Sequence, residues 1–120
     1  MAASLVNDFL RSLGMNLDEW KGEGSMELEL ADRGRIVFET AKEVLLVYLI
    51  SPLTPLQDPR LSERALRLSG NDSSIPFPVH CALSPDGLLV FAIRLDPDRQ
   101  SLLDLERAIE CLLASEHQFL

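Results

Sequence analysis

The feature that most constrains the fold is the apolar stretch at residues 43–50, which reads Glu-Val-Leu-Leu-Val-Tyr-Leu-Ile. It has the length of a β-strand and is far too short to cross a bilayer as a helix. Because successive positions are apolar, both faces of this strand should be covered, as they are at the centre of a sheet. Pro52 and Pro55 then end the strand.

Two further strands precede this one. Residues 26–30 alternate strictly between apolar and acidic side chains, so Glu27 and Glu29 should face water. Residues 35–39 are rich in β-branched and aromatic side chains, which favour strands. Short turns join all three, so the sequence predicts an antiparallel meander.

Helices are expected before and after the meander along the chain. Residues 4–13 carry apolar side chains at helical spacing, with Ser4 as the N-cap and Gly14 ending the helix. A second, short helix should begin at Asp58-Pro59 and end near residue 70. The last helix should start near Ser101, which forms a capping box with Asp104.

Two more strands fall between the second and last helices, at residues 75–83 and 88–95. Pro76 and Pro78 make the start of the first one irregular or place it at a sheet edge. The element order is therefore α-β-β-β-α-β-β-α. We predict an α+β fold, a twisted antiparallel sheet with helices packed on it, in one domain that covers residues 1–120.

Charge excludes several classes of partner. The chain has 11 basic and 19 acidic residues among 120 and a net charge of −8, so its field repels nucleic acids and anionic membranes. Cys81 and Cys111 are expected as thiols in a reducing compartment. No signal-peptide pattern is visible at the N-terminus, so we expect a cytoplasmic protein.

No pattern of catalytic or metal-binding residues is found. His80 and Cys81 are neighbours in an expected strand, so their side chains should point to opposite faces. Metal-ligand spacing of cysteine and histidine, phosphate-binding loops and dinucleotide fingerprints are missing from the sequence. We therefore expect no enzyme, no metal and no cofactor.

Apolar side chains are in excess for a chain of this size. Hydrophobic residues make up 47% of the sequence, and the third and fifth expected strands are apolar on more than one side. Such a surplus is typical of a subunit interface or a protein-binding groove. The same side chains also suit a plain hydrophobic core.

The order of elements and several local stretches resemble the class I type III secretion chaperones, the CesT/Tir chaperone group. The stretches are the amphipathic helix ending in Leu13-Gly14, the meander at residues 27–50, the segment Arg-Ala-Leu-Arg-Leu-Ser-Gly-Asn at residues 64–71, and the run from residue 83 into the acidic last helix. The stretch after Leu83 is most similar to the subset that chaperones secretion gatekeeper proteins.

This resemblance implies a dimer, either a homodimer or a heterodimer with a related chaperone. It also implies a partner, a secreted effector or gatekeeper protein whose N-terminal, non-globular segment wraps around the dimer. The implied function is to keep that segment soluble and competent for secretion. An extended segment can add a strand to an open sheet edge and seat alternate side chains in apolar pockets.

Two sets of residues are candidates for these contacts, and each set competes with the core interpretation. The client-binding candidates come from the first helix and the meander: Phe9, Leu10, Leu13, Leu28, Leu30, Ile36 and Phe38. The dimer-interface candidates come from the second helix and the fourth strand: Leu61, Leu66, Leu68, Val79 and Cys81.

Other functions stay open at this point. A regulatory adaptor of the secretion system, which sequesters a protein partner, could use the same fold, and the sequence does not choose between the two. A small α+β enzyme would need a polar cluster in a pocket, which the sequence does not indicate. A further alternative is an inert structural subunit of a larger assembly.

Overall fold

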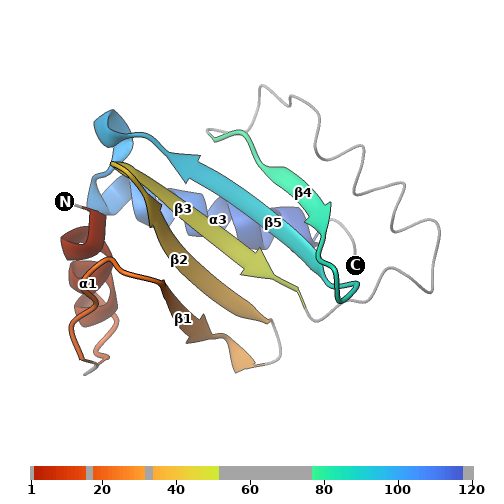
Figure 1. The fold of residues 1–120 in the computed structure, drawn as a ribbon, viewed down its shortest axis with the longest axis horizontal. Helices are drawn as coiled ribbons and strands as arrows, with labels where there is room; N and C mark the ends of the chain where they lie inside the picture. Colours follow the sequence, from red (N-terminus) through yellow and green to blue (C-terminus); the bar gives the residue numbers. More distant parts are fainter. Residues whose placement is uncertain (1, 16–17, 32–33, 52–76, 118–120) are drawn as a thin grey trace.

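A computed structural model describes residues 2–15, 18–31, 34–51 and 77–117 (Figure 1). The expected helix at residues 58–70 lies outside these ranges. The described elements are α1 (Ala2–Ser12), β1 (Ser25–Glu29), β2 (Arg35–Ala41), β3 (Val44–Ile50), β4 (His80–Leu83), β5 (Leu89–Leu95), the 3₁₀ helix η3 (Pro97–Arg99) and α3 (Leu102–His117).

The first helix begins earlier than the sequence predicted. It starts at Ala2, so Ser4 lies inside the helix and the prediction of Ser4 as N-cap is wrong. Ala2 and Ala3 favour helix strongly enough to extend it by two residues. Its end is as predicted, because Gly14 takes a φ of 78° and its amide donates to the Arg11 carbonyl at 2.9 Å.

The fourth strand is shorter than predicted. Regular pairing covers only His80–Leu83, and Phe77–Val79 lie outside the strand. Pro78 has no N–H to donate to a ladder, which explains why pairing starts later. The irregular start expected from the prolines is therefore confirmed for the described residues. No element was predicted at η3, a single turn that opens with Pro97.

The five strands form one antiparallel sheet in the order β1-β2-β3-β5-β4. Its register places one row of side chains across all the strands on a single face: Leu28, Ile36, Leu49, Phe91 and Cys81. Among the described strands, β3 therefore lies at the centre of the sheet, as the apolar stretch predicted, and β1 and β4 lie at its two edges.

The two described α-helices cover the face that carries this row. Helix α3 crosses behind the sheet (Figure 1), and α1 packs on the same side, where the Phe9 ring meets Phe38 edge-on at 6.5 Å. Leu45, Val47 and Leu49 of β3 are fully buried there, but the alternate side chains of β3 are only half-buried. Among the described residues, the second face of β3 is therefore covered only in part, whereas the sequence predicted that both faces would be covered.

The start of α3 confirms the capping box. The Asp104 amide donates to Ser101 Oγ at 3.0 Å, and the Ser101 amide donates to Asp104 Oδ2 at 3.2 Å. The hydrogen bonds from Ser101 hold the pKa of Asp104 below its usual value. This reciprocal pair satisfies amide groups that a helix N-terminus otherwise leaves without partners.

Candidate protein-binding site

The seven client-binding candidates separate into two groups by burial. Phe9, Leu10, Ile36 and Phe38 belong to the hydrophobic core, each with at most 6% of its surface exposed. Leu13 is 53% exposed, and Leu28 and Leu30 are half-buried against the core. The second group is thus the one with side-chain surface available to a partner, and the first group lies beneath it.

The buried side of α1 differs in part from the apolar pattern of residues 4–13. Leu5, Phe9 and Leu13, with Leu10 beside them, carry that pattern, whereas the buried residues are Val6, Asn7, Phe9 and Leu10. The helix is therefore turned so that Leu13 faces solvent. Asn7 lies three residues before Leu10, and this helical spacing is the signal that could have placed it on the buried face.

Strand β1 has an open edge. Leu30 N donates to Gly34 O at 2.9 Å, and the register sets Leu28 opposite Ile36. In an antiparallel ladder the hydrogen-bonded pairs alternate, so Met26, Leu28 and Leu30 exchange their backbone bonds with β2. The N–H and C=O groups of Glu27 and Glu29 consequently point away from β2. Among the described residues no strand pairs with that side of β1.

The segment of residues 20–23, which leads into β1, is held by hydrogen bonds to α1 and β2. We call this hydrogen-bonded segment the strap. Asn7 Nδ2 donates to the Trp20 carbonyl at 2.8 Å, and the Trp20 amide donates to Asn7 Oδ1 at 2.9 Å. Trp20 Nε1 donates to the Glu23 carbonyl, and Thr40 Oγ1 donates to the Gly22 carbonyl at 2.8 Å. The strap fixes β1 relative to α1. Asn7 and Trp20 were not predicted as functional residues, although a single tryptophan just before a strand is a visible signal in the sequence.

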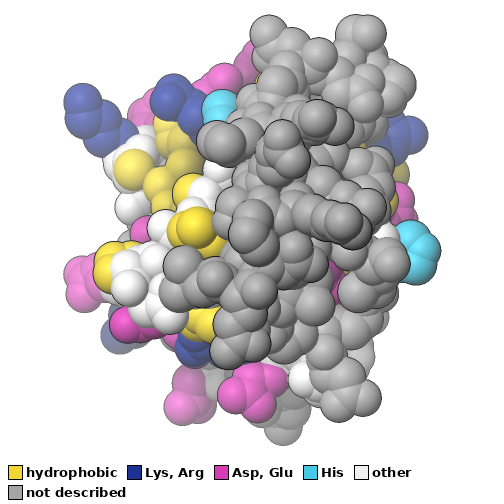
Figure 2. Space-filling view, turned by 90° about the vertical axis from the view of Figure 1, so that its right-hand side faces the viewer, with side chains coloured by type: hydrophobic (Ala, Val, Ile, Leu, Met, Phe, Trp, Pro, Cys, Tyr) yellow, Lys and Arg dark blue, Asp and Glu magenta, His cyan; other side chains and the backbone are white. Residues whose placement is uncertain are grey.

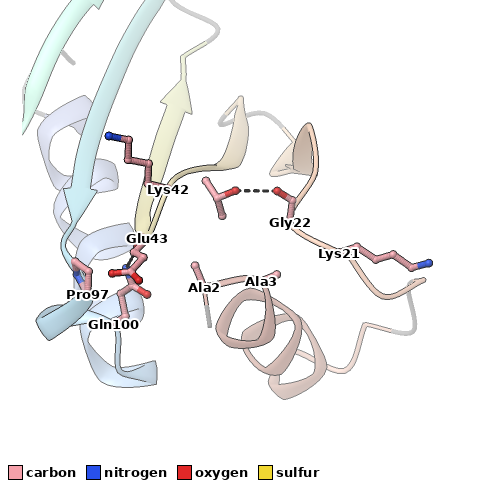
Figure 3. Close-up of a pocket in the computed structure, with 9 residues that line it drawn as sticks. Ala2, Ala3, Lys21, Gly22, Lys42, Glu43, Pro97 and Gln100 are labelled. Carbon is pink, nitrogen blue, oxygen red and sulfur yellow. Dashed lines mark hydrogen bonds between the residues drawn. The ribbon is translucent and has the colours of Figure 1, made fainter.

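A hollow of about 600 Å³ lies where the strap, the N-terminal end of α1 and the β2–β3 turn meet (Figure 3). Its walls include the small side chains Ala2 and Ala3, and both lysines of the chain border it. The side chains of Lys21 and Lys42 point away from its centre, whereas Gln100 and Glu43 lie close together (Figure 3). The Gln100 amide is already used, since Nε2 donates to the carbonyls of Glu43 and Leu95.

The face of the sheet opposite the helices is apolar at its centre. Its half-buried side chains are Leu46, Tyr48, Ile50, Val90 and Ala92. Seen from the β4 side, hydrophobic side chains gather along one flank of the described part of the molecule, with charged side chains around them (Figure 2). Burial, together with a hydrogen bond to the Glu39 carboxylate, raises the pKa of the Tyr48 hydroxyl. This face is the described part of the apolar surplus predicted for the third and fifth strands.

Strand β4 forms the other edge of the described sheet. Of the dimer-interface candidates, Cys81 lies in this strand and Val79 lies just before it. Val79 is buried just before the strand, Cys81 is half-buried within it, and Leu83 is 42% exposed at its end. The other three candidates, Leu61, Leu66 and Leu68, lie outside the described residues.

The described residues show no arrangement suited to catalysis. Burial raises the pKa of the Cys81 thiol to about 11, which disfavours the nucleophilic thiolate. His80 lies beside it on the strand but is exposed on the opposite face. In the described ranges no cluster of three or more His, Cys, Asp or Glu side chains is placed to hold a metal ion. No described helix is long and apolar enough to span a membrane.

Comparison of the fold with solved structures finds several similar chains. A chain of the HopA1–SchA chaperone–effector complex superposes with a TM-score of 0.76 at 21% identity, covering 97% of this chain and 90% of that one. The Yersinia pestis type III secretion chaperone SycH, in complex with a stable fragment of YscM2, gives a TM-score of 0.73 at 18% identity with complete coverage of both chains.

A chain of the heterodimeric ExoU–SpcU complex from the Pseudomonas aeruginosa type III secretion system gives a TM-score of 0.68 at 19% identity, covering 95% of this chain and 93% of that one. No curated protein matches the chain by sequence. These likenesses establish a shared α+β fold, as the sequence predicted.

A family model adds a match along the sequence itself. The model for the type III secretory system chaperone SycN matches residues 2–120. With the strand order and the similar folds, this match confirms the resemblance drawn from the sequence: the chain belongs to the SycN family of type III secretion chaperones.

Proposed function

We propose that this protein is a cytoplasmic, non-enzymatic chaperone that binds the N-terminal, non-globular segment of a type III secreted protein and keeps that segment soluble and competent for secretion. The observation that carries the proposal is the open edge of β1, which offers backbone donors and acceptors beside half-buried apolar side chains. An extended segment binds such an edge by adding a strand. Family membership supplies the secretion context.

The client surface in this proposal is centred on Leu13, Leu28 and Leu30, which retain accessible surface. The other client-binding candidates from the sequence support it from beneath: Phe9, Leu10, Ile36 and Phe38. Strand addition would bury the remaining apolar area of Leu28 and Leu30, and each buried Å² contributes about 25 cal/mol. The proposed client is a gatekeeper protein or an effector, in keeping with the resemblance of the stretch after Leu83.

A dimer is the proposed working form, with a second copy or a related chaperone as the partner subunit. The contact would lie at β4, through Val79 and Cys81, and would include the undescribed leucines at positions 61, 66 and 68. Light scattering of the purified protein measures its oligomeric state directly. A mass of one chain at micromolar concentration would contradict the proposed dimer.

Proline substitutions at neighbouring positions of β1 test the strand addition. The Glu27 amide faces the open edge, so Glu27→Pro removes a donor that only an added strand would use, and proline is tolerated on that side of an edge strand. We expect client affinity to fall about tenfold with little change in thermal stability. Glu27→Gln removes the charge but keeps the amide, and Leu28→Pro breaks a bond to β2 and should lower the melting temperature.

The client is obtained by purifying the tagged protein from its native host and identifying the bound chain by mass spectrometry. Limited proteolysis then maps the protected segment. A stoichiometric secreted protein, protected near its N-terminus and lost from the Glu27→Pro variant, is the expected result. A protected segment elsewhere in the partner, equal retention by Glu27→Pro and the wild type, or a turnover activity would contradict the proposal.

A further inference from the structure

The two faces of β1 differ sharply in chemistry. Met26, Leu28 and Leu30 lie on the helix-covered face and pack against the core, whereas Glu27 and Glu29 are exposed on the opposite face. We propose that the open edge of β1 selects an extended client segment in which Lys or Arg alternates with apolar residues, the basic side chains lying directly opposite Glu27 and Glu29. This inference rests on the proposed function, because it names the chemistry of the client at the same edge.

The pairing geometry fixes which client residues meet which side chains. Glu27 and Glu29 point their backbone groups outward, so an added antiparallel strand would form its hydrogen-bonded pairs at these two residues. Residues directly opposite each other in a sheet project from the same face. Client residues opposite Glu27 and Glu29 therefore share the acidic face, and the residues between them share the apolar face.

Charge on the acidic face favours basic partners. The register brings Glu39 of β2 to the same face beside Ser25, so three carboxylates lie along β1 and β2 there: Glu27, Glu29 and Glu39. The one basic side chain of that face of β1 and β2 is Arg35, whose Nη1 lies 3.4 Å from Glu27 Oε2. Both partners of this pair are substantially exposed, so the contact is weak and leaves the strip negative. The net charge of −8 adds a longer-range field of the same sign.

The apolar face of β1 determines which side chains are favoured at the client residues between those opposite Glu27 and Glu29. Leu28 begins a row that continues through Ile36, Leu49 and Phe91 across the sheet, and its outer side has no strand neighbour among the described residues. An apolar client side chain would extend this row by one position. A polar side chain there would be withdrawn from water without a partner, at a cost in affinity.

A second copy of this chain is a poor occupant of the same edge. When two β1 edges pair antiparallel about a two-fold axis, outward-facing residues can pair only with outward-facing residues. Ser25, Glu27 and Glu29 are those residues, so glutamates would face glutamates or serine. Like charges directly opposite each other destabilise a strand pair. The charges that protect β1 from self-association are thus the ones that favour a basic segment.

Labelled nine-residue peptides measure this selectivity on the full chain. One peptide alternates valine with lysine, a second valine with glutamate, and a third valine with serine; binding is followed by fluorescence anisotropy. We expect the lysine peptide to bind about tenfold more tightly than the glutamate peptide, with a difference that shrinks as salt rises. The double variant Glu27→Lys/Glu29→Lys should reverse the order.

The matched control is Glu106→Lys/Glu110→Lys, which makes the same change in net charge on an exposed side of α3. If this control reverses the preference as strongly as the β1 variant, the preference belongs to the whole molecule and the proposal is overturned. Equal binding of all three peptides, or no binding of any of them, also overturns it. A client that is retained by the wild type and lost from Glu27→Pro would still support strand addition, so the two failures are distinguishable.

Discussion

The two edges of the sheet differ in how they are held and in what they present. Strand β1 is strapped to α1 through Asn7 and Trp20 and exposes a row of carboxylates. Strand β4 follows Phe77, whose ring is covered by the Arg99 guanidinium at 4.2 Å, and its exposed side chains carry no acid.

The charged edge at β1 and the uncharged edge at β4 favour different binding partners. An edge with like charges along one face resists pairing with its own copy and accepts a strand of opposite charge. An edge without acids, ending in the exposed Leu83, suits an apolar contact with another subunit. The difference between the edges thus supports the proposal that the client binds at β1 and that the subunit contact lies at β4.

The largest expected effect on stability comes from replacing a core phenylalanine beneath one edge of the sheet or the other. Phe38 is fully buried opposite Met26 of β1, and Phe91 is fully buried opposite Cys81 of β4. Phe38→Ala should lower the free energy of unfolding by about 3–5 kcal/mol, as removal of a core phenylalanine usually does. Urea denaturation measures the loss.

Hydrogen exchange then shows which edge is affected. We expect Phe38→Ala to reduce amide protection in β1 more than in β4, and Phe91→Ala to do the reverse. Leu13→Ala is the control for an exposed position of α1 and should change stability by no more than about 0.5 kcal/mol. Equal loss of protection at both edges would show that the edges are not stabilised separately.

Periodicity was enough to predict each described strand, although β4 is shorter than predicted, and to put the apolar stretch of β3 at the centre of the sheet. It was less informative about burial within α1, because a side chain such as Asn7 is buried for its hydrogen bonds rather than for its hydrophobicity. The seven client candidates shared one apolar character, and only the three-dimensional packing separates Phe38 in the core from Leu13 at the surface. Open backbone groups of an edge strand leave no trace in residue types, so the β1 site needed the pairing register.

Breaking the strap should loosen β1 and leave β4 unchanged. Asn7→Ala removes both hydrogen bonds to the Trp20 backbone and leaves a buried N–H and C=O to find other partners. We expect a loss of about 2–3 kcal/mol of stability. Trp20 is the chain's single tryptophan, so its emission reports the change directly and should shift to longer wavelength.

Asn7→Asp provides the comparison for this variant, because the carboxylate can still accept from the Trp20 amide but cannot donate to the Trp20 carbonyl. The stability of Asn7→Asp should lie between those of the wild type and Asn7→Ala if the two hydrogen bonds contribute separately. Wild-type emission and stability in Asn7→Ala would show that the strap does not hold β1.

The smallest expected effect is a pH dependence that belongs to β4. The pKa of the Cys81 thiol is raised from 9.0 in the unfolded chain to about 11 by burial. Between these values the unfolded chain has released the proton that the folded chain keeps, so the free energy of unfolding falls as pH rises. Stability is fully present below pH 9 and declines towards pH 11, by about 1–2 kcal/mol once partial solvent screening of the half-exposed thiol is allowed for.

Urea denaturation at pH 8, 9, 10 and 11 measures this decline, and Cys81→Ala should flatten it. The pKa values of Cys111 and Tyr48 are also raised by burial, so part of the slope will persist in the variant. Cys111→Ala is the matched control, since it removes a thiol from α3 and leaves β4 intact. An alkaline slope that is unchanged by Cys81→Ala would mean that the thiol at this edge is as hydrated as in the unfolded chain, and β4 would then lose the apolar character that distinguishes it from β1.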